Sequence, residues 1–470
     1  MMAPGNLEVG IIGAGIGGVT AAIAIARAGA KVTVLEAASQ LGEIGAGIQM
    51  TPNVARLLIR YGVDKSIGRD LVKFEELNMR RKDGTLVGWT KISRVEKATG
   101  FPWWLVHRHH LHTGLVEVAR QSGAELLIDS RVVKLEQVEG SQVSVTTEKG
   151  KHHEFDLVIG SDGVQSVTRK TLFPGVRPKP PTANCAFRAI VPYDEIRSDP
   201  LTRELVEDKD GNLIRTMEVW MAPTGYIISY PISDAKDFNM VLSHFHDPPV
   251  SQVEEVSIQE VRNQYSSYDP RIRRIIEKIR PPIFRWPLLV TGPLESWSNP
   301  EKNIVLIGDA AHSMTNHMAQ GAATSMEDGC FLARCLKHVV SGSLTLADAI
   351  SVYEKGRMPK ASYKQQVSFL NGWMWHLPDG PAQQARDKSM EVELKGEVPM
   401  RSANLYGDPS TVLECYGYDA EAHADDDIAT FLNDGKPVRD AVTTIVRSEA
   451  QKIANWFLPN GHKFEISPRL

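Results

Sequence analysis

The chain has 470 residues, of which 42% are hydrophobic, and a formal net charge of −4 at pH 7. This slightly acidic balance argues against nucleic acid or an anionic membrane surface as the main partner. The four cysteines lack zinc-site spacing and are too few for a disulfide framework, so a cytoplasmic location is expected; the C-terminal Ser-Pro-Arg-Leu matches a peroxisomal signal only poorly.

The N-terminal stretch predicts a strand, a tight turn, a helix and a second strand. A β-rich run over residues 8–12 leads into Gly13, Gly15 and Gly18, which are spaced GxGxxG. The first glycine permits the turn, the second lets a pyrophosphate approach the backbone, and the third lets the helix pack closely on the strand. The second strand ends in Glu36, where a carboxylate accepts ribose hydroxyls. These distances predict a dinucleotide site, and the interrupting glycines exclude a membrane-spanning helix.

Two connections follow the second strand. Residues 42–47 form a glycine-rich loop that either lines a flat ligand or is simply a tight connection, and Pro52 stands near the start of the next helix. Residues 74–100 alternate in polarity around an Asp83-Gly84 turn, a pattern that predicts a β-hairpin.

A histidine-rich segment precedes a helix that is expected from about Leu111 to Ser122. The spacing of its histidines puts no three of them on one face of a regular element, so a surface or helix-cap role is favoured over metal binding. These histidines are His107, His109, His110 and His112. Arg108 lies just before the helix and is a candidate for contact with a phosphate, with a surface salt bridge as the alternative.

A second crossing from strand to turn follows a run of short strands between residues 126 and 160. Its last strand leads into Asp162-Gly163, at the edge of a parallel sheet where ligands of α/β proteins bind. Four prolines within residues 173–182 then mark a crossing between domains. From residue 184 to about residue 294 the pattern predicts an antiparallel sheet, interrupted by one basic helix over residues 261–282 whose charges face solvent.

The parallel-sheet pattern returns with an apolar strand over residues 304–307, which ends at Gly308-Asp309. Asp309 therefore stands where a ribityl- or ribose-binding acid would stand. A long amphipathic helix is expected to start near Gly321, and its N-terminus near Ala322 favours negative charge beside it. A further helical pattern extends over residues 347–369.

These patterns divide the chain into three parts. A dinucleotide-binding domain is expected from residues 1–73, 101–180 and 295–370. A substrate-binding β-sheet domain is expected from residues 74–100 and 181–294. A C-terminal helical region is expected from residues 371–470, with one helix around residues 440–456.

Three separated motifs resemble those of a known family. GAGIGG with Glu36, DLVIGSDG and VLIGDAAH are similar in order and spacing to single-component FAD-dependent monooxygenases of the para-hydroxybenzoate hydroxylase fold. GAGIQMTPN, FRAIVP, HMAQGAATSMEDG and HLPDGP resemble the salicylate hydroxylase group, especially its fungal members. The resemblance covers essentially the whole chain. It implies an α/β fold in which a Rossmann-like FAD-binding domain carries an inserted mixed or antiparallel β-sheet substrate domain and a helical C-terminal region.

The resemblance also implies roles in FAD binding. Glu36 would bind the adenosine ribose, and Arg108 and Asp309 would hold the ribityl and phosphate region. Asp162-Gly163 would lie near the pyrophosphate and the path of the nicotinamide, and Gly321 would lie beside the pyrimidine edge of the flavin. The expected cofactor contacts are Gly13, Gly15, Gly18, Glu36, Gly47, Gln49, Arg108, Asp162, Gly163, Asp309, Gly321 and Ala322. No metal is expected.

The substrate side is expected on the predicted β-sheet. The period of two along YIISYPI puts Tyr226 and Tyr230 on one face of a strand. Arg188 lies on another largely apolar strand, where it either pairs with an acid of the sheet or, as the resemblance implies, holds and activates the substrate together with Tyr230. Tyr226, His317 and Met318 are further candidates for substrate contact. Relatives often carry proline where this chain has Asn316.

The implied activity is hydroxylation of a phenol or another electron-rich aromatic ring, including polyketide-derived phenols, with NADH or NADPH and dioxygen through a flavin hydroperoxide. The chain holds one complete dinucleotide fingerprint, so the nicotinamide cofactor is expected to bind transiently elsewhere. The alternative is decarboxylative or dearomatising hydroxylation of a phenolic acid. A flavin-dependent halogenase, suggested by WMWHLP at residues 373–378, and a non-catalytic FAD-binding protein are less favoured. A monomer or homodimer is expected.

Overall fold

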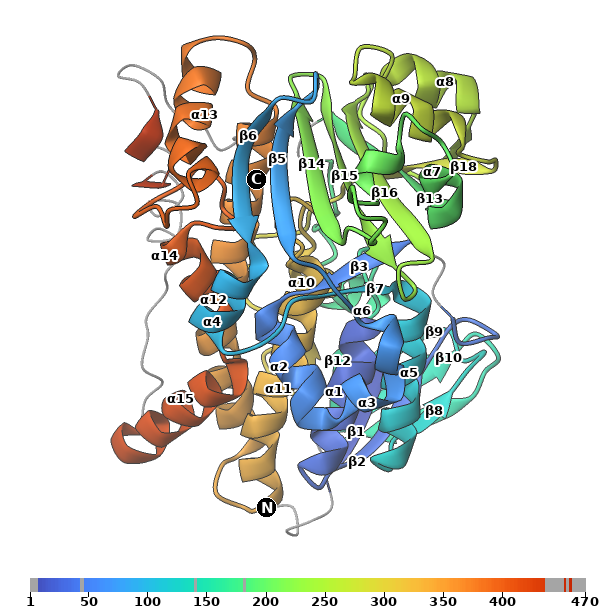
Figure 1. The fold of residues 1–470 in the computed structure, drawn as a ribbon. Helices are drawn as coiled ribbons and strands as arrows, with labels where there is room; N and C mark the ends of the chain where they lie inside the picture. The colour runs from blue at the N-terminus through green and yellow to red at the C-terminus, as the bar shows by residue number, and fades with distance from the viewer. Residues whose placement is uncertain are drawn as a thin grey trace.

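The computed structural model describes residues 7–42, 46–138, 142–180, 183–435, 452–453 and 456–458. The lower half of the molecule in Figure 1 is organised around a five-stranded sheet with the order β19-β12-β1-β2-β8, in which all neighbouring strands are parallel. Its strands are β1 (Glu8–Ile12), β2 (Lys31–Leu35), β8 (Glu125–Leu127), β12 (Leu157–Gly160) and β19 (Ile304–Leu306). The helix α1 (Ile16–Arg27) joins β1 to β2, which confirms the predicted N-terminal unit.

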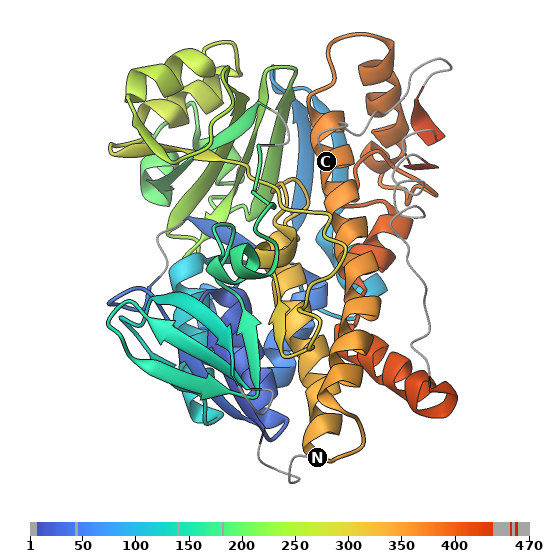
Figure 2. The same cartoon turned by 180° about the vertical axis from the view of Figure 1, so that it is seen from behind.

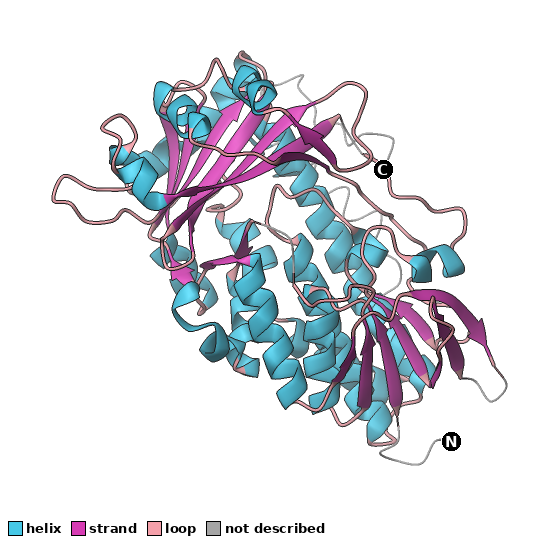
Figure 3. Ribbon diagram, turned by 90° about the vertical axis from the view of Figure 1, so that its right-hand side faces the viewer, coloured by secondary structure: helices cyan, strands magenta, loops and turns pink. Residues whose placement is uncertain are grey.

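A layer lies on each face of this sheet, as Figure 3 shows. One face packs Ile12, Val158 and Ile304 against a three-stranded antiparallel sheet, and the other packs Val9, Ile11 and other apolar side chains against helices. The small sheet consists of β9 (Val132–Gln137), β10 (Val143–Thr147) and β11 (His152–Phe155). The helical layer includes α1, α2 (Pro52–Tyr61), α3 (Val63–Ile67), α5 (Arg108–Gln121) and α11 (Gly321–Val340).

Helices α1 and α11 pack so closely that there is no room for a side chain at two of their glycines. A Cβ atom at Gly17 would stand 1.7 Å from Ser325 Oγ, and one at Gly329 would stand 2.7 Å from the Cβ of Ala21. Real side chains do not approach this closely, so both positions require glycine. The contact therefore fixes the start of α11 above the first turn of α1.

The upper half contains an eight-stranded sheet with the order β17-β18-β13-β16-β15-β14-β5-β6. Its strands are β5 (Glu76–Arg81), β6 (Leu86–Lys91), β13 (Asn184–Pro192), β14 (Thr216–Ala222), β15 (Gly225–Ile232), β16 (Asp237–Phe245), β17 (Glu254–Val256) and β18 (Ile283–Pro287). The β14–β5 pair is parallel and the other pairs are antiparallel, so the sheet is mixed. The predicted α/β class is thus confirmed, with a mixed sheet beside the parallel one. A smaller sheet of β3 (Gly47–Met50), β7 (Trp104–His107) and β4 (Val72–Lys73) lies between the two halves.

Three predicted boundaries were wrong. The hairpin ends at β6, and the helix α4 (Ile92–Thr99) follows, because Ile92, Val95 and Thr99 are buried at helical spacing. The predicted basic helix is two helices, since Asp269 caps a new helix at the amide of Arg271. They are α8 (Ile258–Gln264) and α9 (Pro270–Glu277), which with α7 (Tyr193–Arg197) cover one face of the large sheet. Helix α5 begins at residue 108 rather than 111 because the His107 ring caps it.

Helix α12 (Leu346–Trp375) runs from the lower half to the large sheet, as Figure 2 shows. It ends at Trp375, beyond the predicted end at about residue 369. The shorter helices are α6 (Val167–Leu172), α10 (Asp309–His312), α13 (Pro381–Leu394), α14 (Pro409–Thr411) and α15 (Ala420–Asp434). The predicted helix around residues 440–456, the C-terminal signal and residues 43–45 of the glycine-rich loop lie mostly or wholly outside the described residues.

The four cysteines are free and buried. Among the helices in the described ranges, none is both long enough and apolar enough to cross a membrane. The same ranges contain no group of three or more His, Cys, Asp and Glu side chains that could hold a metal ion.

The buried carboxyl of Glu393 joins α13 to its surroundings. It accepts hydrogen bonds from the Ser402 hydroxyl, from Asn404 Nδ2 at 3.1 Å and from the amide of Trp89 in β6 at 3.1 Å. Burial raises the pKa of Glu393 from 4.5 to about 7, although these hydrogen bonds oppose the rise. The folded protein therefore favours the neutral acid.

A Glu393→Gln variant should become more stable relative to the wild type as pH rises from 5 to 8. The raised pKa stabilises the wild type fully below the unfolded value of 4.5, and this contribution is lost as pH rises through about 7, on the order of 3 kcal/mol in all. Melting temperatures of both proteins measured across this range check the prediction, with Glu391→Gln on the exposed side of α13 as the control. A melting-temperature difference that does not change with pH would contradict it.

Candidate active site

The carboxyl ends of β1, β2, β12 and β19 meet at one edge of the parallel sheet. Gly13, which follows β1, has φ +98°, and a Cβ there would lie 2.5 Å from the carbonyl oxygen of Ser161. A Cβ at Gly18 would lie 2.1 Å from the carbonyl oxygen of Gly13. Gly15 caps α1 without a side chain, so the first turn of the helix presents its amides at this edge. The predicted turn geometry is present, and the cradle suits a pyrophosphate.

Glu36 stands at the end of β2 beside the same turn. Its two carboxylate oxygens accept hydrogen bonds from the amides of Ala14 and Ala38, each at 2.7 Å. Each oxygen keeps a second lone pair that can accept a hydroxyl. His112 adds a contact that the surface-or-cap assignment missed, because its buried ring lies 2.7 Å from the carbonyl oxygen of Ala14. The only indication of this contact in the sequence is that His112 lies one turn after the start of α5.

The turn after β12 is organised by Asp162. One carboxylate oxygen accepts a hydrogen bond from the Ser166 hydroxyl at 2.5 Å, and the other accepts one from the Thr168 amide at 2.9 Å. Asp162 thus holds the turn that leads into α6, while Gly163 takes φ +73°. Arg169, which the sequence analysis did not single out, is fully buried and donates to the carbonyl oxygen of Ala310 at 2.9 Å. It joins this turn to the one after β19.

Asp309 opens α10 after β19, and solvent reaches its side chain. Desolvation by the surrounding protein nevertheless raises the pKa of its carboxyl, and the charge of Arg108 opposes this rise. Burial likewise raises the pKa of Tyr230, and the charges of Arg188 and Arg108 oppose it there. A Cβ at Gly47, a predicted cofactor contact, would lie 2.6 Å from the ring of Tyr230, a predicted substrate contact, so the two predicted sides of the site are neighbours.

A network of buried charges lies directly behind the turn at Gly308. One oxygen of Asp328 accepts hydrogen bonds from the Gly308 amide at 3.0 Å and contacts the His312 ring at 2.6 Å. Its other oxygen accepts from Nε of Arg357 at 2.9 Å. The guanidinium of Arg357 also reaches Glu327 at 2.9 Å. All these side chains are buried, so α11 and α12 are joined by full charges away from water.

Glu327 extends this network to α2. It accepts hydrogen bonds from Lys364 Nζ at 2.6 Å and from Asn53 Nδ2 at 2.7 Å. Asn53 also contacts Gln320, the residue before α11, and Gln320 donates to Thr51. Gly47 belongs to the adjoining β3, and its amide donates to Asn239 of the large sheet at 2.7 Å. These hydrogen bonds hold the start of α11, where Gly321 and Ala322 lie, in a fixed position relative to α2.

The predicted strand faces of the large sheet are confirmed. Tyr226 and Tyr230 belong to the buried cluster that faces α12, and Phe187 belongs to the cluster on the other face. Arg188 and Ile228 both pair with Val241 of β16, so they stand at the same level of the sheet. Phe187 and Ala189, the neighbours of Arg188 in β13, belong to the cluster on the other face, so strand alternation places this arginine on the face of the tyrosines.

Tyr226 links this face to the loop before α11. Its hydroxyl lies 3.0 Å from Asn316 Oδ1 and 2.9 Å from His317 Nδ1. Burial lowers the pKa of His317 to about 3, so the ring is neutral at physiological pH. Asn316, the departure from the family pattern, therefore contacts the tyrosine. Met318 is buried next to His317, and its carbonyl oxygen lies 3.4 Å from the Tyr416 hydroxyl.

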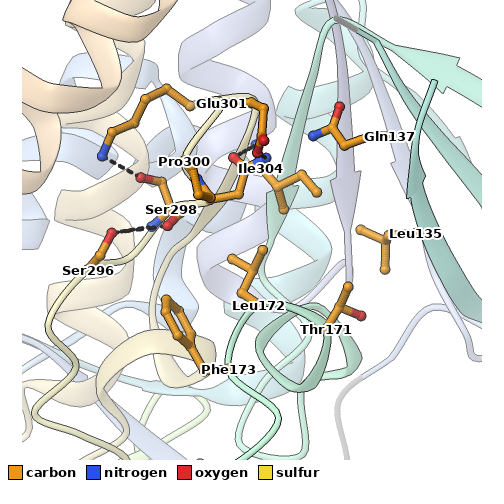
Figure 4. A pocket seen from close by; sticks show the side chains of 12 residues that line it. Leu135, Gln137, Thr171, Leu172, Phe173, Ser296, Ser298, Pro300, Glu301 and Ile304 are labelled. Carbon is orange, nitrogen blue, oxygen red and sulfur yellow. Dashed lines mark hydrogen bonds between the residues drawn. The ribbon is translucent and has the colours of Figure 1, made fainter. Parts of the chain in front are cut away.

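A separate cavity of about 550 Å³ lies at the amino end of β19, between Leu135 and Gln137 of β9 and the loop that carries Ser296 and Ser298 (Figure 4). The ammonium of Lys302 at its wall is paired with Glu354 at 2.5 Å. Ligands of α/β sheets bind at the carboxyl ends of the strands, which is the opposite edge. The cavity is therefore not part of the candidate active site.

Comparison with known proteins gives consistent matches. A family model described as an FAD binding domain matches residues 6–224 and 295–365. The chain is 30% identical over 431 residues to the FAD-dependent monooxygenase OpS4 of Beauveria bassiana, covering 90% of this chain and 97% of that protein. It is 32% identical over 403 residues to a 3-hydroxybenzoate 6-hydroxylase of Polaromonas naphthalenivorans, covering 85% and 94%. A solved salicylate hydroxylase substrate complex shares the fold with a TM-score of 0.70 and 21% identity, covering 90% of this chain and 98% of that one.

An Asp309→Ala variant should bind FAD roughly ten- to a hundredfold more weakly than the wild type, because charge-assisted hydrogen bonds are worth about 1.5–3 kcal/mol each. Asp162→Ala should instead lower the melting temperature of the apoprotein, since Asp162 holds its own turn. Titration of each apoprotein with FAD, followed by flavin fluorescence, gives the affinities. Equal affinity of the wild type and the Asp309 variant would refute the assignment.

Replacing Lys364 by Met should destabilise the protein by about 3 kcal/mol, because it removes one partner from a buried ion pair. Adding Glu327→Gln should restore only part of the loss, because it removes the negative charge that Lys364 neutralised but also takes one ion-pair partner from Arg357. Lys360→Met, one turn earlier on α12, removes a surface ion pair with Glu414 and a cation–π contact with the Tyr418 ring at 5.1 Å, and should cost about 1 kcal/mol. Denaturant unfolding of the four proteins measures these differences, and equal losses for the two lysine variants would exclude a special role for the buried pair.

Proposed function

The chain belongs to the family of FAD-dependent aromatic monooxygenases, and we propose that it hydroxylates the ring of a phenol bound beside Arg188. The observation that carries the proposal is a guanidinium on the inner face of the large sheet, at the level between two buried tyrosines. The curated relative named as a 3-hydroxybenzoate 6-hydroxylase supports a phenolic substrate.

The residues at the nucleotide edge fit FAD. The side-chain-free cradle at Gly13 and Gly15 would take the pyrophosphate, and Glu36 would take the adenosine ribose. Asp309 and Arg108 would hold the ribityl and phosphate region, and the amides at the start of α11 would face the pyrimidine edge near Gly321. When bound, FAD takes a hydride from NADH or NADPH and, with dioxygen, supplies the oxygen atom that enters the ring.

Arg188 would activate the substrate by stabilising its phenolate. A phenol with a pKa near 10 is almost wholly protonated at neutral pH, whereas the phenolate is the electron-rich form that reacts. One opposite charge within reach lowers such a pKa by about 1–3 units, which raises the phenolate fraction roughly ten- to a thousandfold. Arginine suits this role because it stays charged when partly buried.

Tyr230 and Tyr226 would orient the ring that Arg188 holds. The Tyr230 hydroxyl would form a hydrogen bond with the phenolate oxygen, because burial keeps this tyrosine protonated and therefore a donor. His317, neutral and bonded to Tyr226, would fix the second tyrosine in place. Met318 and the buried aromatic side chains near it would keep water from the reacting ring.

An Arg188→Gln variant should keep its FAD and still consume NADH or NADPH, but form at least tenfold less hydroxylated product at neutral pH. The lost charge leaves the phenol protonated, so the reducing equivalents appear as hydrogen peroxide. Product and peroxide per nicotinamide oxidised are measured between pH 6 and 10, with Arg280→Gln, an exposed arginine paired with Glu195, as the control. Product yield near that of the wild type across this range would exclude Arg188 and direct attention to His317.

A further inference from the structure

The segment of residues 313–317, which follows α10, has two different sides. Ser313, Thr315 and His317 are buried, whereas Met314 and Asn316, which alternate with them, are partly exposed. Such alternation is typical of an extended backbone that lies on a surface. One side of the segment therefore faces the protein, and the other side is open.

The buried side of the segment lies on α12 and is bonded to three side chains of that helix. These side chains are buried and follow one another at intervals of three residues, so they form a single stripe on the helix surface. Each donates a hydrogen bond to a carbonyl oxygen of the segment: Gln365 to Ser313 at 3.0 Å, Ser368 to Thr315 at 2.8 Å, and Asn371 to His317 at 2.6 Å. This polar stripe of Gln365, Ser368 and Asn371 therefore holds every second carbonyl.

The end of α12 packs closely against the end of the segment. A Cβ at Gly372 would stand 2.3 Å from Cδ2 of His317, so the ring needs a glycine there. The ring centroid of Trp375 lies 6.1 Å from that of His317 and 4.8 Å from that of Tyr226. The Tyr406 hydroxyl donates a second hydrogen bond to the His317 carbonyl oxygen at 3.3 Å. These contacts hold His317 against the helix.

The open side of the segment reaches both predicted sides of the active site. Met314 lies at the cofactor side, because a Cβ at Gly321 would stand 3.8 Å from Cγ of Met314. Asn316 lies at the substrate side, because its Oδ1 is 3.0 Å from the Tyr226 hydroxyl. The same short backbone carries both side chains, so a movement of this backbone relative to α12 would displace both.

We propose that the three side chains of the polar stripe are positioning residues for hydroxylation, and that the segment they hold presents Met314 to the flavin and Asn316 to the aromatic substrate. The inference rests on the proposed hydroxylation of a phenol. Transfer of an oxygen atom requires close alignment of the reacting groups, and a displacement of about 1 Å can cost about a hundredfold in rate. When the alignment is lost, the nicotinamide is still oxidised, but dioxygen leaves as hydrogen peroxide.

The cofactor end of the segment is tested without turnover. Met314→Ala should bind FAD about fivefold more weakly than the wild type, because it removes an apolar contact with the flavin. Met358→Ala changes another partly buried methionine, on α12, and should bind FAD as the wild type does. Titration of the apoproteins with FAD, followed by flavin fluorescence, gives the affinities. Equal affinities of the two variants would overturn the assignment of Met314.

The polar stripe is tested by Asn371→Asp, which keeps the size of the side chain but replaces the N–H donor by an acceptor. At pH 8 the new carboxylate repels the His317 carbonyl oxygen, so the holoenzyme should form about fivefold less product per nicotinamide oxidised than the wild type. Burial raises the pKa of such a carboxyl, and its protonated form donates to that carbonyl as the amide did. The yield relative to the wild type should therefore rise as pH falls to 6.

The neighbouring titratable groups stay neutral in this pH range. Burial lowers the pKa of His317 to about 3 and that of His376 to about 4, and it raises the pKa of Tyr406 well above its ordinary value. The expected pH dependence of the Asn371→Asp variant relative to the wild type therefore belongs to the new carboxyl.

Two further variants separate positioning from stability. Gln366→Glu makes the same change from amide to acid at another buried position of α12, about 160° around the helix from the middle of the polar stripe. It should leave the product yield unchanged at each pH, even where it lowers the melting temperature. Ser368→Ala removes the middle hydrogen bond at the loss of one atom, so it should lower the yield at every pH, and it decides the test if Asn371→Asp does not fold.

Three results would each overturn the positioning role. They are a yield of Asn371→Asp that equals the wild type at pH 8 or does not recover in acid, an equal loss of yield in Gln366→Glu, and an unchanged yield in Ser368→Ala. If the wild type itself hydroxylates no phenol, the proposed function fails, and the positioning role fails with it.

Discussion

The buried network of Glu327, Asp328, Arg357 and Lys364 is the constraint on which the rest of the site depends. Removing such charges from water costs several kcal/mol for each ion, and only close pairing offsets the cost. The pairing here is complete only when α2, α11 and α12 stand in one arrangement, because each helix supplies part of it. The network thereby fixes the Gly308 amide and the start of α11 at the cofactor side. It also fixes the loop that carries Asn316 and His317 at the substrate side.

Because side chains alternate along each strand, one face of the large sheet packs against helices and the other carries the candidate substrate residues. One face packs Phe187 and its neighbours against α7, α8 and α9 in a buried apolar cluster. The other face carries the tyrosines and Arg188 toward α12 and the C-terminal region, whose Tyr406 and Tyr416 pack around Trp103. A single-residue shift in strand register would exchange the two faces. By fixing the strand register, the apolar cluster on one face therefore keeps Arg188 and the tyrosines on the other face.

Local patterns made much of the fold predictable. The glycines after β1, the acid after β2 and the alternation along β15 each depend on neighbours in sequence, so their geometry could be read directly. The missed residues act over long distances: Arg169 reaches a carbonyl 141 positions away, and Asn53 reaches Glu327 across 274 positions. No local pattern encodes such pairs. The helix α4 was missed for another reason, because the strand pattern before it was extended to residue 100 although Ile92 and Val95 already have helical spacing.

Helix α12 has a consequence for how this protein can vary. Arg357 of the buried network and Trp375 at the substrate end lie on this one helix, about 27 Å apart along its axis. Inserting or deleting one residue between them would turn everything beyond by about 100° and shift it by about 1.5 Å. Trp375 and Asn371, which binds the carbonyl oxygen of His317, would then leave their partners. Side chains along this segment can therefore be exchanged, whereas a change in its length would break these contacts, and room for a different substrate has to arise by substitution or in the connection after Trp375.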